Sequence, residues 1–191
     1  MKKKTIILMS KQPRYGLCKK RLSKHIKQSE ILRITRNNID NLLMVFSLYN
    51  IYDVKVAIYP QKLIYRSFKN TGFLKSIPQK NKNLGKKIWD IKNSTNNPTV
   101  IIGSDIPGID KKKIDYAFKI IESKNIVLGP SEDGGFWLIG FSNKKSITYP
   151  FDGLLWSKKN TLVNTIKKLY YYKITYGLCD KMKDIDNIND Y

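Results

Sequence analysis

The sequence predicts an α/β fold, a three-layer α/β/α arrangement with a mostly parallel central sheet. Two observations support this prediction. Short apolar, β-branched runs alternate along the chain with longer amphipathic segments, as expected where helices connect parallel strands. Several of these runs are apolar at consecutive residues, which is typical of strands buried on both faces. Because the chain has 191 residues and no repeat, low-complexity block or linker, we expect one domain covering residues 1–191.

The first half of the chain is expected to form three strands and two helices. The strand patterns are Thr5–Ser10, Val54–Tyr59 and Phe73–Pro78, and the helix patterns are about His25–Tyr49 and Leu84–Lys92. In the longer helix, apolar residues recur at the spacing of one helical face. These residues are Ile39, Leu42, Leu43 and Phe46.

The second half is expected to form four more strands and two more helices. The strands are Thr99–Ile102, Ile126–Leu128, Gly135–Phe141 and a last one near Tyr171–Tyr176. Asp110 is expected to cap a helix whose buried face is Ile114, Ala117, Phe118 and Ile121. Ser157 is expected to cap the other, with Leu162, Thr165, Ile166 and Leu169 on one side. Because ligands bind beyond the carboxyl ends of strands in such sheets, the loops there are examined first.

Composition excludes several classes of protein. The formal net charge is +21, but most of the positive charge comes from Lys and only five residues are Arg. A genome rich in A and T would favour Lys codons throughout, which accounts for this charge. We therefore expect no nucleic-acid partner. No segment approaches the roughly 18 apolar residues of a membrane helix. Cys18 and Cys179 form no CxxC pair, and His25 is the only histidine, which excludes multi-histidine metal centres. We expect a cytoplasmic protein.

The loop after the first strand carries a concentration of cations. Residues 11–22 contain Lys11, Arg14, Lys19 and Arg21 between an expected strand and an expected helix. Converging Lys and Arg side chains suit a diphosphate or triphosphate, whose charge they neutralise. The loop has neither the Walker A nor the GxGxxG pattern. A solvated basic loop in a Lys-rich chain explains it equally well.

Two further loops contain carboxylates. Asp105 directly follows the run Thr99–Ile102 and Gly103, where an α/β enzyme can hold a Mg²⁺ or Mn²⁺ ion, although a turn or capping role is an alternative. Asp133 precedes Gly134 and Gly135 between two apolar runs, where a hairpin turn alone would account for the glycines.

The last two features lie nearer the carboxyl terminus. Trp156 is interpreted as either a core residue or an aromatic wall for a sugar or base, with the core interpretation favoured. Asp184 and Asp186 in the tail project to the same side if the chain is extended, and a helix cap is an equal alternative.

Taken in order, these features resemble one bacterial family, the radical-SAM/selenodomain-associated transferase 1 family, once listed as a domain of unknown function. It is a branch of the GT-A glycosyltransferase-like superfamily. The matching motifs are Lys-x-Pro-x-x-Gly-x-x-Lys-x-Arg-Leu at 11–22, Leu-Gly at 84–85, Gly-Ser-Asp-x-Pro at 103–107, Gly-Pro-x-x-Asp-Gly-Gly at 129–135, Phe-x-Gly-x-x-Trp-Ser at 151–157 and Asp-Ile-Asp at 184–186. The resemblance covers almost the whole chain.

The resemblance implies a nucleotide-diphosphosugar transferase-like fold and a role for each motif. Lys11, Arg14, Lys19 and Arg21 would contact phosphates. Asp105, with Asp186 and perhaps Asp184 from the tail, would bind the metal ion. Asp133, Gly134 and Gly135 would line the acceptor or sugar pocket, with Asp133 as the catalytic base or as a second-sphere ligand of the metal. Trp156 would contact substrate. The chain departs from the family in four places. Lys20 replaces a Thr, Lys86–Lys87 replace an Arg, and Phe136 replaces a Tyr. The classical Asp-x-Asp metal motif is absent at Asp105, which follows Gly103 and Ser104.

The expected function is therefore a Mg²⁺- or Mn²⁺-dependent transferase that uses a nucleotide-activated donor, in the first place a nucleotide-sugar glycosyltransferase. The acceptor, a small molecule or a lipid-linked group, is left open, as is the oligomeric state. One alternative is a nucleotidyltransferase, similar to guanylyltransferases of the phospholactate type, that takes an NTP and releases pyrophosphate. More distant alternatives are a nucleic-acid-binding module and a nucleotide binder without catalysis.

Overall fold

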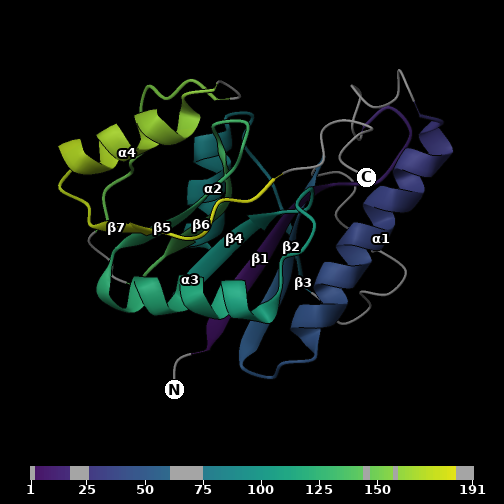
Figure 1. Cartoon of the computed structure of the whole chain (residues 1–191), viewed down its shortest axis with the longest axis horizontal. Helices are drawn as coiled ribbons and strands as arrows, with labels where there is room; N and C mark the ends of the chain where they lie inside the picture. The colour runs from purple at the N-terminus through teal and green to yellow at the C-terminus, as the bar shows by residue number, and fades with distance from the viewer. Residues whose placement is uncertain (1–2, 18–25, 61–74, 144–146, 157–158, 184–191) are drawn as a thin grey trace.

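The computed structural model describes residues 3–17, 26–60, 75–143, 147–156 and 159–183. In these residues one seven-stranded sheet has the order β3-β2-β1-β4-β6-β5-β7 (Figure 1). The strands are β1 (Lys4–Lys11), β2 (Tyr52–Tyr59), β3 (Lys75–Pro78), β4 (Thr99–Gly103), β5 (Ile126–Pro130), β6 (Phe136–Phe141) and β7 (Tyr176–Leu178). Only β6 pairs antiparallel with its neighbours, so the described sheet is mostly parallel as predicted.

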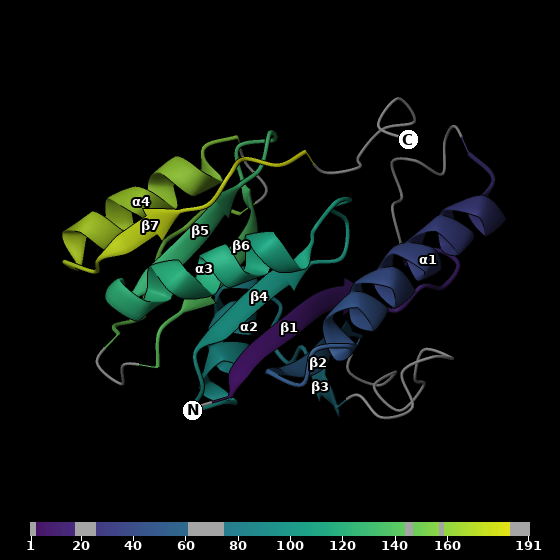
Figure 2. The ribbon, with the colours of Figure 1, turned by 60° about the horizontal axis from the view of Figure 1, so that its bottom comes forward.

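Helices cover both faces of the sheet. They are α1 (Gln28–Ser47), α2 (Leu84–Asn93), α3 (Lys111–Ser123) and α4 (Thr161–Tyr171). The buried residues of α1 and α3 cluster with Ile6 and Leu8 of β1, whereas those of α2 and α4 cluster with Ile7 (Figures 1 and 2). Successive residues of a strand point to opposite faces, so β1 contributes to both clusters. The three-layer α/β/α prediction is confirmed.

The boundaries of the elements follow the expected patterns, with two exceptions. Asp110 caps α3 by accepting a hydrogen bond from the Lys113 backbone N–H at 2.9 Å, as predicted. The predicted cap of α4 at Ser157 is wrong, because α4 begins at Thr161 and its N-cap residue is Asn160. Ser157 itself lies outside the described residues. None of the helices in the described residues has the length and apolar run that crossing a membrane requires.

The predicted last strand, Tyr171–Tyr176, is also wrong in its position. α4 continues through Tyr171, and β7 begins at Tyr176, where it pairs with Ile126 of β5. Lys173 has a φ of 53°, and the Ile174 N–H donates to the Leu169 carbonyl at 2.8 Å, which ends the helix. The tyrosines therefore extend the helix, because the turn at Lys173 decides where the strand can start.

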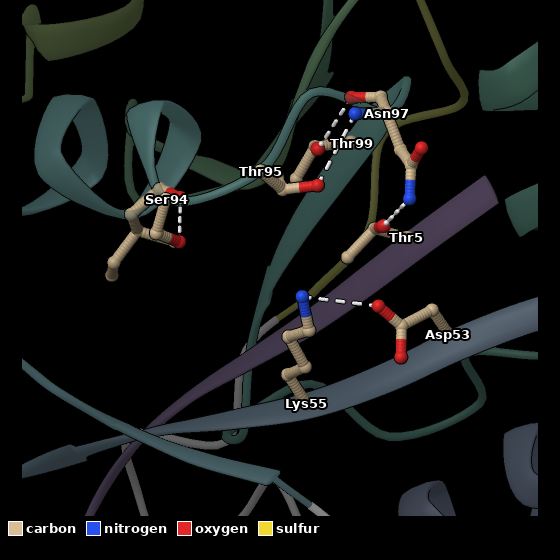
Figure 3. A network of polar contacts seen from close by, with 8 residues as sticks. Thr5, Asp53, Lys55, Ser94, Thr95, Asn97 and Thr99 are labelled. Atoms are coloured by element: carbon tan, nitrogen blue, oxygen red, sulfur yellow. Dashed lines mark hydrogen bonds and ion pairs between the residues drawn. The ribbon is translucent and has the colours of Figure 1, made fainter. Parts of the chain in front are cut away.

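Polar side chains at the amino edge of the sheet bind one another. Thr5 of β1 lies between Asp53 of β2 and Thr99 of β4 in the register of the sheet. The Asn97 side chain donates to Thr5 Oγ1 at 3.1 Å, and Thr99 Oγ1 donates to the Asn97 carbonyl at 2.9 Å (Figure 3). Lys55 Nζ lies 3.0 Å from a carboxylate oxygen of Asp53. These five side chains are thus paired within the fold.

Candidate functional site

Three of the sequence motifs lie at the opposite, carboxyl edge of the sheet. β1, β2 and β4 run in one direction, and β5 shares it because β6 is antiparallel to both β4 and β5. The loops that follow β1, β4 and β5 therefore leave the sheet at the same edge. The chain proceeds from β1 to β2 on one side and later returns to β4 on the other side (Figure 2). Such a reversal between β1 and β4 is where open α/β sheets form a ligand crevice.

The loop after β1 is ordered by a turn. The Leu17 N–H donates to the Arg14 carbonyl at 3.1 Å, and Gly16 has a φ of +75°, which suits the third position of a type II turn. The Gln12 N–H donates to the Tyr59 carbonyl at 2.9 Å and extends the pairing of β1 with β2. Lys11 is exposed and Arg14 is half-buried at this edge. The other two predicted phosphate ligands, Lys19 and Arg21, lie outside the described residues.

A lysine that the sequence left without a role lies close to this loop. Lys87, in the first turns of α2, has its Nζ 4.3 Å from the centroid of the Tyr59 ring. Burial, and after it the positive charge of Lys11, lower the pKa of Lys87 below the ordinary value for lysine. In the sequence, Lys86–Lys87 appears only as a replacement for the family's Arg. The alternation of β1 and β2 residues could have placed Lys11 and Tyr59 on the face that α2 covers.

The start of α2 is held by aromatic side chains. A Cβ on Gly85 would lie 2.7 Å from Phe151 Cβ and 2.8 Å from Trp156 Cζ2. The Leu-Gly motif and the Phe-x-Gly-x-x-Trp motif are therefore two halves of one packing contact. Trp156 also packs edge-on against Phe136, with ring centroids 6.1 Å apart. Its buried indole N–H has no hydrogen-bond partner within the described part of the chain.

Asp105 follows β4 on the other side of β1. Its carboxylate is exposed and accepts a hydrogen bond from the Ser104 hydroxyl at 3.3 Å. One exposed carboxylate at a strand end suits Mg²⁺ or Mn²⁺, which bind one or two protein carboxylates and complete their coordination with water and substrate phosphate. The described residues contain no group of three or more His, Cys, Asp or Glu that could hold a metal ion. Asp186, the predicted second ligand, lies outside them.

Asp133 is held by its own loop. Its Oδ1 accepts hydrogen bonds from the Ser131 hydroxyl and from the Gly135 backbone N–H, the second at 2.8 Å. Gly134 has a φ of +86°, and a Cβ there would lie 1.8 Å from the Lys159 carbonyl oxygen. The Gly134 carbonyl also accepts the Leu162 N–H at 2.9 Å, at the start of α4. A glycine at Gly134 is thus required by the close contact between this loop and the start of α4.

The tail after β7 runs along β5 toward the site. Met182 forms an isolated parallel bridge with Ser131, and its N–H donates to the Pro130 carbonyl at 3.0 Å. A Cβ on Gly108, in the loop after Asp105, would lie 3.9 Å from Met182 Cε. The described tail therefore ends beside the β4–α3 loop. Asp184 and Asp186 follow and lie outside the described residues.

Solved structures with the same fold include nucleotide-using transferases. The "putative nucleotide-diphospho-sugar transferase" of Desulfovibrio desulfuricans G20 matches with a TM-score of 0.85 at 20% identity, over 98% of this chain and 84% of that one. CMP:2-keto-3-deoxy-manno-octonic acid synthetase, complexed with CTP, matches with 0.58 at 10% identity over 98% and 95%. Rv0371c from Mycobacterium tuberculosis H37Rv matches with 0.60 at 12% identity over 100% and 96%. Its complex with manganese matches with 0.52 at 11% identity, over the same shares.

At these identities the likeness shows the fold alone, and it confirms the expected nucleotide-diphosphosugar transferase-like, GT-A architecture. No curated protein matches the chain. Residues 49–158, more than half of the sequence, match a family of bacterial proteins. The chain belongs to this family, which is described as "Uncharacterized protein conserved in bacteria (DUF2064)".

Proposed function

We propose that this protein is a divalent-cation-dependent transferase that uses a nucleotide-activated donor, in the first place a nucleotide sugar. One observation carries the proposal. Cationic side chains after β1 and the Asp105 carboxylate after β4 flank the point where the connectivity of the sheet reverses. This is the position at which α/β sheets bind nucleotides. The fold shared with a nucleotide-diphospho-sugar transferase and the family resemblance support it.

In this proposal the donor diphosphate binds on the β1 loop. Lys11 and Arg14 contact its oxygens, and Lys19 and Arg21 join them by the family resemblance. Transfer of the sugar leaves a diphosphate on which negative charge develops. Fixed cations stabilise that charge more in the transition state than in the ground state, and this difference accelerates the reaction.

Asp105 would hold Mg²⁺ or Mn²⁺, with Asp186 as the second protein ligand. A bound divalent cation supplies further neutralisation of the leaving diphosphate. The Ser104 hydroxyl hydrogen bond to Oδ1 orients the Asp105 carboxylate. The manganese complex of Rv0371c, a protein of the same fold, supports a role for a divalent cation.

Asp133 would act on the acceptor. The donors that bind its Oδ1 fix the carboxylate and leave Oδ2 for the acceptor hydroxyl, which Asp133 orients or deprotonates. Gly134, Gly135 and Trp156 would line this side of the pocket. Trp156 packs on Phe136, the residue after Gly135, so the aromatic wall and the loop are neighbours.

The proposal is tested by a thermal-shift screen of nucleotide sugars, nucleoside diphosphates and NTPs, each with and without Mn²⁺. A ligand that binds the folded state raises the melting temperature. We expect one nucleotide sugar to do so in the presence of Mn²⁺, and Asp105→Asn to abolish the Mn²⁺-dependent part of the shift. Glu122→Gln, an exposed acid near the far end of α3, is the control and should leave the shift unchanged. If no ligand of the panel raises the melting temperature at millimolar concentration, the proposed nucleotide site is wrong.

The second candidate is a nucleotidyltransferase that joins an NTP to a phosphorylated acceptor. The fold shared with a synthetase solved with CTP favours it. The attacking acceptor phosphate would form a bond to the α-phosphorus, and pyrophosphate would leave. Stabilisation by an NTP but by no nucleotide sugar, followed by release of pyrophosphate, selects this function. Release of a nucleoside diphosphate selects glycosyl transfer.

A further inference from the structure

Two lysines from different elements lie together on one face of the sheet at its carboxyl edge. Lys11 ends β1, and its partner in the register is Tyr59, the last residue of β2. Lys11 lies an even number of residues from Ile7, and Tyr59 from Ala57, so each pair is on the same face of its strand. Ile7 and Ala57 belong to the cluster under α2 and α4. Lys87 extends from α2 onto the Tyr59 ring, with its Nζ 4.3 Å from the ring centroid. Tyr59 is thus the backbone neighbour of Lys11 and lies under the Lys87 ammonium group.

The surroundings of Lys87 disfavour its charged form when no ligand is present. Burial removes part of the hydration of the Lys87 ammonium, and the charge of Lys11 repels it, and both effects lower the pKa of Lys87. The face of the Tyr59 ring attracts the ammonium group and acts against these two effects.

Within the described parts of the chain, no carboxylate balances the two charges. Among the described residues no Asp or Glu forms an ion pair with Lys11 or Lys87. The neighbouring stretches of sequence cannot supply one either, since residues 18–25 and 61–74 contain no acid. The acids outside the described residues are Asp184, Asp186 and Asp190 of the tail. Two close cations without a counter-ion are the arrangement expected of a site that binds an anion.

The position of Lys87 is built into the fold. The side chain of Gln79 donates to the carbonyls of Ser10 and Ala57, at 3.1 and 2.8 Å, and ties the ends of β1 and β2 to the segment that leads into α2. Asn83 caps α2, and Gly85 lets the helix approach Phe151 and Trp156. These contacts hold the first turns of α2 against the ends of β1 and β2. Lys87 is therefore held near Lys11 by packing and not by an attraction between the two side chains.

We infer that Lys87 is a further phosphate-binding residue, and that with Lys11 it holds the diphosphate of the donor across the ends of β1 and β2, beside the Tyr59 ring. The inference rests on the proposed function. It extends the site from the β1 loop to α2, on the side of β1 opposite to Asp105. The donor diphosphate then lies between two cations on one flank and the Asp105 carboxylate on the other.

Inorganic pyrophosphate is the probe, because it carries the group that nucleotide sugars, nucleoside diphosphates and NTPs share. Its affinity is measured by calorimetry at about 0.15 M salt, which screens non-specific attraction to a basic surface. The test variant is Lys87→Met, and the matched control is Lys86→Met, which removes the exposed neighbour on the same helix. We expect Lys87→Met to weaken binding by about tenfold or more, as for a lost charge-assisted contact, and Lys86→Met by less than about twofold. Lys87→Arg should retain most of the affinity.

A second readout separates binding from structural support. Removing a cation that repels Lys11 should leave the melting temperature of the ligand-free protein unchanged or raise it, while the shift produced by pyrophosphate is lost. A ligand-free melting temperature that falls in Lys87→Met means that Lys87 supports the fold or pairs with the tail, and overturns the inference. Wild-type affinity in Lys87→Met overturns it as well.

The failure of this inference is distinguishable from failure of the proposed function. If the wild type binds a nucleotide with Mn²⁺, Asp105→Asn abolishes that effect, and Lys87→Met binds pyrophosphate normally, only the role of Lys87 is wrong. If the wild type binds neither pyrophosphate nor any nucleotide, both are wrong.

Discussion

Named polar side chains at the two edges of the sheet differ in whether they are paired with one another. At the amino edge, Thr5, Asn97 and Thr99 form a hydrogen-bonded row, and Lys55 is paired with Asp53 (Figure 3). At the carboxyl edge, Lys11 and Lys87 lie close together without an ion-pair partner in the described residues, and Asp105 has only a neighbouring hydroxyl. The same strands supply both edges, so the sheet itself does not cause the difference.

We infer from this difference that the polar groups of the amino edge stabilise the fold and that those of the carboxyl edge bind a ligand. A half-buried charge costs free energy unless it is paired, and at the amino edge Lys55 is paired with Asp53. Among the charges of the carboxyl edge, that of Lys87 is disfavoured in the free protein by burial and by the charge of Lys11. Their arrangement becomes favourable when a phosphate and a divalent cation bind.

Asp133 tests the comparison with the largest expected effect, since its loop is at the carboxyl edge but is internally hydrogen-bonded. Asn keeps an oxygen for the Ser131 hydroxyl and the Gly135 N–H, so Asp133→Asn should preserve stability. It should lower turnover of the donor found in the screen by about 10²-fold or more, because the base is lost. The rate is measured as nucleotide released.

Asp133→Ala is the companion variant. It should lower stability as well, by about 1–2 kcal/mol, because two hydrogen bonds are lost. Normal turnover in Asp133→Asn would assign Asp133 to the turn alone and move its loop into the same class as the amino edge.

Gly85→Ala tests whether packing determines where the cation of α2 lies. The added methyl group has no room against Phe151 and Trp156, so we expect a loss of about 1–3 kcal/mol in the free energy of unfolding. Pyrophosphate affinity should fall too, because α2 and Lys87 are displaced together. Denaturant unfolding and calorimetry measure the two effects. If the variant is destabilised but keeps its affinity for pyrophosphate, binding does not depend on how packing at Gly85 positions α2.

Lys55→Met tests the amino edge and has the smallest expected effect. It leaves the half-buried Asp53 without its cation, so stability should fall by about 1–2 kcal/mol, or about 3–6 °C in melting temperature. Pyrophosphate binding should stay unchanged. This is the reverse of the pattern expected for Lys87→Met. An unchanged melting temperature would contradict a stabilising role for pairing at this edge.

Most of the fold was predictable because its signals are local. The buried face of α3 and its cap at Asp110 follow from residues within the helix itself. The predictions that failed depended on contacts between distant residues. The tyrosines near residue 171 have high strand propensity, but Lys173 and the pairing of Tyr176 with Ile126 decide where β7 starts. Such tertiary contacts override propensity.

The candidate site divides in the same way. The loops after β1, β4 and β5 could be identified from the sequence, because residues that follow strands of a parallel sheet must meet at one edge. Lys87 could not be identified, because only the packing of Gly85 against Phe151 and Trp156 brings α2 close enough for Lys87 to reach Tyr59.

The sequence by itself determined the order of strands and helices, the layered class and the three loops that carry charge, since each depends on the residues in one segment. Only the tertiary structure decided which charges are paired and which are not, because pairing depends on distances between segments that the chain does not encode locally. The unpaired approach of Lys87, on α2, to Lys11, on β1, is of this second kind. The unpaired approach is the one that points to a ligand.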